Sequence, residues 1–207
     1  MKRRHLTAAA VAAALLAALP AAAEDTVKIG LILPMTGPSA STGREIEAAA
    51  RLYLQQNGAT VAGKNVELIV KDDTGTADVT KRLAQELVVK DKVAVLAGFG
   101  LTPLAAAAAP IATQAKVPQV IMAAATAATT EASPFIVRTS FTLPQATVPL
   151  ADWAAQNGIK TVVTLVSDYA PGLDAQKAFA ERFGKAGGQV AEQLQVPLKN
   201  PDFAPFL

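Results

Sequence analysis

Two short turns in the sequence combine small residues with a threonine hydroxyl, and this combination can bind an anion. The first turn runs from Gly98 to Pro103 and contains Thr102, and the second runs from Ala123 to Thr126. Each turn follows a predicted strand and precedes a stretch with helical character. Free backbone N–H groups and a hydroxyl at such a place can bind a carboxylate without an arginine. For either turn alone, composition favours an ordinary helix cap.

Tyr169 is placed where an aromatic ring could cover a ligand. It follows another predicted strand, in the run Ser167–Gly172. If a second lobe faces the first, the ring points into the cleft and could cover an apolar or aromatic ligand. A packed loop aromatic fits the same pattern equally well. Trp153 lies within a helical pattern, which favours a place in the core.

Adjacent acids, Asp72 and Asp73, follow a third predicted strand. Paired carboxylates can serve as catalytic groups or metal ligands. Neighbouring acids after a strand more often cap a loop or the next helix, and we favour that interpretation. No metal site and no cofactor are predicted.

The first 23 residues are typical of a cleavable secretory signal. Lys2, Arg3 and Arg4 precede an apolar run of about 14 residues, and the segment ends in small residues. The apolar run is shorter than the roughly 18 to 20 residues of a membrane-spanning helix. We therefore expect cleavage after Ala23, no membrane insertion of the mature protein and a periplasmic location.

Removing this signal changes what chemistry the chain can perform. It takes three of the 19 basic residues, which leaves 16 against 17 acidic residues and lowers the formal net charge from +2 to −1. Such a chain lacks the concentrated positive field that binds nucleic acid or an anionic membrane. The signal also contains His5, the only histidine, and the sequence has no cysteine. Catalytic triads and His- or Cys-based zinc sites are thus excluded from residues 24–207.

Nucleotide-binding motifs are missing as well. No G-x-G-x-x-G follows the first predicted strand, and no G-x-x-x-x-G-K-[ST] occurs in the sequence. The G-x-S-x-G elbow of α/β hydrolases is also absent. These absences argue against a dehydrogenase and against an exported hydrolase, and we expect a protein that is not an enzyme.

Short β-rich runs alternate with longer helical runs, which predicts an α/β fold with parallel sheets covered on both faces by helices. The expected strands are 27–33, 66–70, 93–97, 120–123, 135–138, 161–166 and 189–196. The expected helices are 45–56, 76–90, 103–116, 145–157 and 174–185. We assign 24–140 to a first α/β lobe, with a crossover near 139–144, and 141–207 to the truncated start of a second lobe.

Six short motifs occur in an order that resembles the branched-chain amino-acid-binding (Leu/Ile/Val-binding) family of periplasmic proteins of ABC transporters. They are Val27–Leu31 with Pro34–Pro38, Asp72-Asp73, Ala97-Gly98 with Thr102, Ala124–Ala127, Arg138-Thr139, and Asp168-Tyr169 with Gly172. The resemblance covers essentially all of residues 24–207. It implies a type I periplasmic binding protein, in which two doubly wound lobes joined by a hinge close on a small solute.

Carried over by position, the resemblance also implies a ligand site. The Thr102 hydroxyl, the Ala124 N–H, and the N–H and hydroxyl of Thr126 would bind the carboxylate of the solute, and Tyr169 would close over it from the second lobe. The acidic residue that binds an amino group in amino-acid-specific members would lie beyond Leu207. The implied partners are a small carboxylate and a membrane permease, and the implied state is a monomer.

Two departures from the family pattern bear on the solute. The first loop has Thr42 where many members place an aromatic residue, and the third turn reads Gly-Phe-Gly-Leu-Thr-Pro. Phe99, expected beside the site, makes the sequence more similar to members associated with aromatic carboxylates than with leucine. The alternative function is an extracytoplasmic ligand-sensing domain of the same fold.

Overall fold

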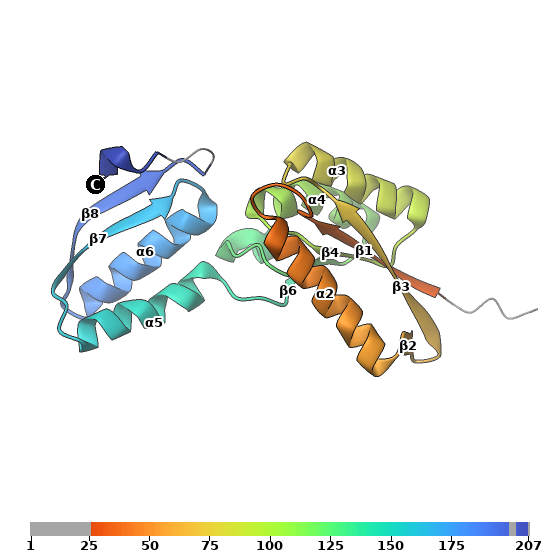
Figure 1. Cartoon of the computed structure of the whole chain (residues 1–207), viewed down its shortest axis with the longest axis horizontal. Helices are drawn as coiled ribbons and strands as arrows, with labels where there is room; N and C mark the ends of the chain where they lie inside the picture. Colours follow the sequence, from red (N-terminus) through yellow and green to blue (C-terminus); the bar gives the residue numbers. More distant parts are fainter. Residues whose placement is uncertain (1–25, 199–201, 207) are drawn as a thin grey trace, which may run out of the picture.

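The computed structural model describes residues 26–198 and 202–206. The predicted signal, residues 1–23, lies outside these described residues. The chain forms two sheets that lie side by side, each with its own helices (Figure 1). The boundary that we predicted at residue 140 falls between the last strand of the first sheet and the first helix of the second part.

The first sheet has six strands in the order β2-β3-β1-β4-β5-β6. Neighbouring strands are parallel except for the short β2, which pairs antiparallel with β3. The strands are β1 (Thr26–Leu33), β2 (Thr60–Val61), β3 (Lys64–Asp72), β4 (Val95–Gly98), β5 (Gln119–Ile121) and β6 (Ile136–Arg138). The alternating pattern of the sequence predicted this sheet correctly, apart from β2.

Helices cover both faces of this sheet. They are α2 (Ala40–Asn57), α3 (Ala77–Glu86), which continues as a π-turn η1 (Leu87–Asp91), and α4 (Thr102–Ala115). Ile32 of β1 packs with residues of α3 and α4, whereas its neighbours Leu31 and Leu33 face the side on which α2 lies. Because successive side chains of a strand point to opposite faces, a continuous apolar run buries residues on both sides.

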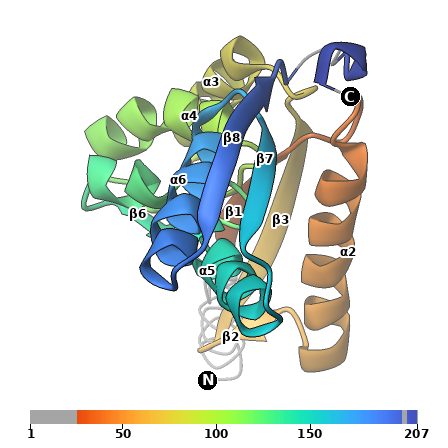
Figure 2. The ribbon, with the colours of Figure 1, turned by 90° about the vertical axis from the view of Figure 1, so that its left-hand side faces the viewer.

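The second sheet contains β7 (Thr161–Ser167) and β8 (Gln189–Val196), which are parallel. Helices α5 (Leu143–Gln156) and α6 (Ala170–Lys185) lie against one face, where Phe179 and Phe183 pack with their ring centroids 5.3 Å apart. The other face is open among the described residues (Figure 2), and Val163 and Leu165 are exposed there. A 3₁₀ turn, η3 (Ala204–Phe206), follows β8.

Two local predictions differ from the structure. Trp153 was expected in the core but is 56% exposed, because α5 packs against α6 through Ala151 and Ala154 and turns the tryptophan toward solvent. Helix α2 starts five residues before the predicted Glu45 and takes in Thr42. Its first turn is allowed by Gly43, where a Cβ atom would lie only 2.3 Å from the carbonyl oxygen of Pro34.

Candidate functional site

A cavity of about 320 Å³ lies between the carboxyl edge of the six-stranded sheet and the start of α6. This volume is at the lower end of the roughly 300 to 1,000 Å³ typical of small-molecule sites. Its lining is mainly apolar, and no charged side chain belongs to it: Gly100, Leu101, Thr102, Ala123, Ala124, Ala125, Phe141, Leu143, Tyr169 and Pro171. The site therefore fits a small, largely apolar molecule with few polar groups.

The two threonine turns meet at this cavity, as the sequence analysis expected. Thr102 begins α4, Thr126 precedes the 3₁₀ segment η2 (Ala127–Ala132), and their hydroxyl oxygens lie 2.8 Å apart. The two residues do not play the same part, since Thr102 lines the cavity and Thr126 lies behind it, against a groove on the outer side of α4. If Thr126 donates to Thr102, the hydrogen of the Thr102 hydroxyl remains free for a carboxylate.

Ala124 lines the cavity, but its backbone N–H is already bonded. It donates to the carbonyl oxygen of Phe99 at 3.0 Å. The expectation that this N–H binds the solute is therefore wrong for this structure. Family position could not reveal the bond, because it depends on how the turn after β4 folds back on the turn after β5.

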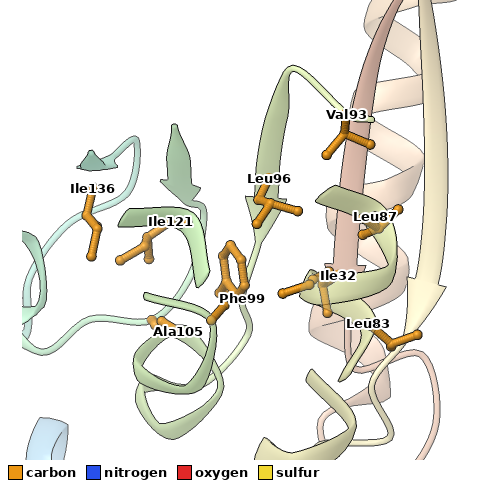
Figure 3. Packing of buried hydrophobic residues seen from close by; sticks show 13 residues of the cluster. Ile32, Leu83, Leu87, Val93, Leu96, Phe99, Ala105, Ile121 and Ile136 are labelled. Carbon is orange, nitrogen blue, oxygen red and sulfur yellow. The ribbon is translucent and has the colours of Figure 1, made fainter. Parts of the chain in front are cut away.

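Contrary to the prediction from the sequence, Phe99 does not lie beside the cavity. Its side chain is fully buried in the core between the sheet and α4, near Ile32, Leu96 and Ala105 (Figure 3). The backbone of Phe99 has φ +66°, in the left-handed region, and the preceding Gly98 has φ +111°. At Gly98 a Cβ atom would lie 2.3 Å from the carbonyl oxygen of Ile32, so only glycine fits. This bend turns the phenylalanine away from the cavity.

Residues from the second part of the chain form the opposite wall. Tyr169 is the residue immediately before α6, it lines the cavity as expected, and burial raises the pKa of its hydroxyl. Pro171 follows in the first turn of α6. A Cβ atom at Gly172 would lie 2.0 Å from the carbonyl oxygen of Ser167, so this glycine lets α6 start directly against the end of β7.

The sequence analysis missed Phe141 and Leu143, which also line the cavity. Both lie just after β6, in the segment that leads into α5. A signal was present, because the end of β6 lies at the same sheet edge as the two threonine turns. The sequence pattern predicts only a crossover between the lobes for this segment.

Asp72 and Asp73 cap loops, as favoured from the sequence, and lie outside the cavity lining. The Asp72 carboxylate accepts hydrogen bonds from the N–H groups of Met35 and Thr74 and from the Thr36 hydroxyl, at 2.8 to 2.9 Å. Burial alone would raise the pKa of Asp72, but these bonds outweigh it and the pKa is lowered. Burial dominates at Asp73 and raises its pKa, although Gly75 and Thr80 donate to it.

Within residues 26–198 and 202–206, no group of three or more His, Cys, Asp or Glu side chains is placed to hold a metal ion. Over the same described stretch, no helix combines the length and apolar character that crossing a membrane requires.

Comparison with known proteins assigns the class. The family model described as "Periplasmic binding protein" matches residues 26–207, and the chain belongs to this family. Its relatives include the Leu/Ile/Val-binding protein homolog 6 of Brucella abortus, 44% identical over the whole chain and 53% of the relative. The chain thus spans about half the length of the curated relatives it matches.

Two solved structures extend the comparison. A solute-binding protein of an ABC transporter from Rhodopseudomonas palustris BisB5, in complex with 3,4-dihydroxybenzoic acid, is 63% identical with a TM-score of 0.86. Another, from Rhodopseudomonas palustris HaA2 in complex with p-hydroxybenzoic acid, is 46% identical with a TM-score of 0.85. Each comparison covers 88% of this chain and 50% of the other. The α/β architecture expected from the sequence is that of these solute-binding proteins.

Proposed function

We propose that the protein is the periplasmic receptor of an ABC importer and that it captures a hydroxylated aromatic carboxylate. The observation that carries this proposal is the composition of the cavity. One wall offers the hydroxyl of Thr102, which Thr126 contacts from behind, and the other offers the aromatic ring of Tyr169, with apolar residues between them. A flat molecule with an anionic group at one end matches that distribution.

Capture would occur by closure of the two parts of the chain. The cavity takes residues from the edge of the six-stranded sheet and from the start of α6. A solute that contacts both walls binds the closed form better than the open form, so it shifts the population toward closure. The segment 139–142 connects the two parts, between β6 and α5.

The choice of an aromatic acid over a branched-chain amino acid is supported by the solved relatives. The relative with 63% identity was solved with 3,4-dihydroxybenzoic acid, whereas the relatives named for Leu/Ile/Val binding are 44% identical. The mainly apolar lining of the cavity also fits an aromatic ring.

The expected partner of the loaded receptor is a membrane permease, to which a monomeric receptor would deliver the solute. This role needs no catalytic group and no cofactor. The proposal concerns the full-length secreted protein, since about half the length of the relatives lies outside the 207 residues.

Thermal unfolding of the full-length secreted protein tests the proposed solute class. The panel is 3,4-dihydroxybenzoate, 4-hydroxybenzoate, benzoate, leucine, isoleucine and glucose. We expect the hydroxybenzoates to raise the melting temperature, because a ligand that binds only the folded state stabilises it by mass action. A rise with leucine and isoleucine but not with the hydroxybenzoates would contradict the proposal.

A further inference from the structure

One peptide unit beside the cavity is held at both ends by charged side chains. The carbonyl oxygen of Thr126 accepts a hydrogen bond from Nη2 of Arg138, and the N–H of the next residue, Ala127, donates to Oδ2 of Asp174 at 2.9 Å. Arg138 also donates through Nε to the carbonyl oxygen of Ala124 at 3.1 Å. Hydrogen bonds that involve a charged partner are stronger than neutral ones.

The two charges stabilise the same orientation of this peptide. A peptide dipole has its negative end at the carbonyl oxygen and its positive end at the N–H. The guanidinium of Arg138 lies at the negative end and the carboxylate of Asp174 at the positive end. Rotating the peptide would therefore lose two favourable interactions at once, which fixes the backbone immediately after Thr126.

The two charged residues come from different parts of the molecule. Arg138 is the last residue of β6, in the six-stranded sheet, whereas Asp174 lies in α6. The Arg138 guanidinium is partly buried, which lowers its pKa, and the nearby Asp174 acts in the opposite direction. Arg138 can hold the turn whatever the position of α6. Asp174 reaches the turn only when α6 lies against the edge of the six-stranded sheet.

We propose that Asp174 is a positioning residue that couples closure of the two parts to the alignment of the Thr126 turn. Its hydrogen bond to the Ala127 N–H forms on closure. The peptide unit is then bonded at both ends, since Arg138 already donates to its carbonyl oxygen. Closure thus fixes the backbone that carries Thr126, whose hydroxyl contacts Thr102. The inference rests on the proposed closure mechanism but not on the identity of the solute.

The test compares the closed population of variants of the full-length protein without solute. The 207 residues contain no cysteine, so Gln85→Cys in α3 and Lys185→Cys in α6 provide exposed spin-label sites on the two parts. Pulsed electron paramagnetic resonance then gives the distribution of distances between the labels. The matched control is Glu181→Gln, which removes one negative charge from an exposed site on the same helix.

We expect a closed population in the labelled wild-type protein and in Glu181→Gln, and a clear shift to longer distances in Asp174→Ala. Asp174→Asn keeps an oxygen acceptor for the Ala127 N–H but loses the charge. Its distance distribution should therefore lie between those of the wild-type protein and Asp174→Ala. A merely structural role would lower the melting temperature without this graded shift. If Asp174→Ala does not fold, the Asp174→Asn distribution decides.

Affinity for 3,4-dihydroxybenzoate gives a second readout. Asp174→Ala should weaken it about 10-fold, the scale of one hydrogen bond to a charged group. If the wild-type protein does not bind this acid, the proposed solute is wrong, and the distances alone still decide on Asp174. Identical distance distributions in wild type and Asp174→Ala, or no closed population in the wild type, would overturn the proposal.

Discussion

The two walls of the cavity are built differently. The wall on the six-stranded sheet consists of turns after buried strands, with helices on both faces of the sheet and Phe99 locked in the core behind them. The opposite wall consists of the start of α6 and the segment after β6, with Phe141 59% exposed. Under the proposed function, this difference predicts that the first wall anchors the solute and that the second wall covers it.

The largest effect is expected when one phenylalanine is truncated on each side of the cavity. Phe99→Ala should lower the free energy of unfolding by about 3 to 5 kcal/mol, because it leaves a cavity in a packed core. Phe141→Ala should change stability by less than about 0.5 kcal/mol, since much of the ring is exposed, but it should weaken solute binding. Chemical denaturation and calorimetric titration of the full-length protein check both. Equal losses of stability in Phe99→Ala and Phe141→Ala would contradict the difference in packing between the two walls.

Thr102, which lines the anchoring wall, and Thr126, which lies behind it, should contribute differently to solute affinity. Thr102→Val keeps the shape but removes the hydroxyl that faces the cavity, and we expect a loss of about 1.5 to 3 kcal/mol in binding to 3,4-dihydroxybenzoate. Thr126→Val should cost about 0.5 to 1.5 kcal/mol, the worth of an ordinary hydrogen bond, because it acts through Thr102. A larger loss for Thr126→Val would mean that Thr126 contacts the solute directly, as the family resemblance implied.

The smallest effects are expected at the acidic pair outside the cavity, where stability should change and affinity should not. Because the pKa of Asp72 is lowered in the folded state, its ionised form stabilises the fold at pH values above its unfolded-state pKa, near 3.8. This contribution is lost as the pH falls through the pKa of the folded state. The cost of Asp72→Asn should thus grow from pH 3 to pH 6. It should stay below about 1 kcal/mol, because the carboxylate is only partly buried.

Asp73→Asn provides the matched control with the opposite sign. Since burial raises the pKa of Asp73, its contribution is fully present below about pH 3.8 and is lost as the pH rises through the folded value. The cost of Asp73→Asn should therefore shrink from pH 3 to pH 6. Denaturant unfolding at several pH values measures both variants, and parallel pH profiles would show that the two environments do not differ as described.

Much of the architecture was predictable because the signals were local. Apolar strand runs and helical spacing indicated the parallel strands but not the two-residue antiparallel β2, and parallel order brings the strand ends to one edge. That is why Thr102 and Thr126 could be expected to lie close together, and the 2.8 Å between their hydroxyls confirms it.

The details that failed depend on backbone geometry or on partners distant in sequence. The direction of Phe99 follows from a left-handed φ that its residue type does not indicate. Trp153 is exposed because α5 turns its two alanines toward α6. The Ala124 N–H is occupied by a carbonyl 25 residues earlier in the chain, and no spacing rule predicts such a bond.

A crystal structure of the full-length protein with 3,4-dihydroxybenzoate would show whether this cavity is the solute site. We expect the carboxylate within hydrogen-bond distance of the Thr102 hydroxyl and the ring against Tyr169, in the cavity between the two walls. An acid bound elsewhere, or one with its carboxylate directed away from Thr102, would contradict the account.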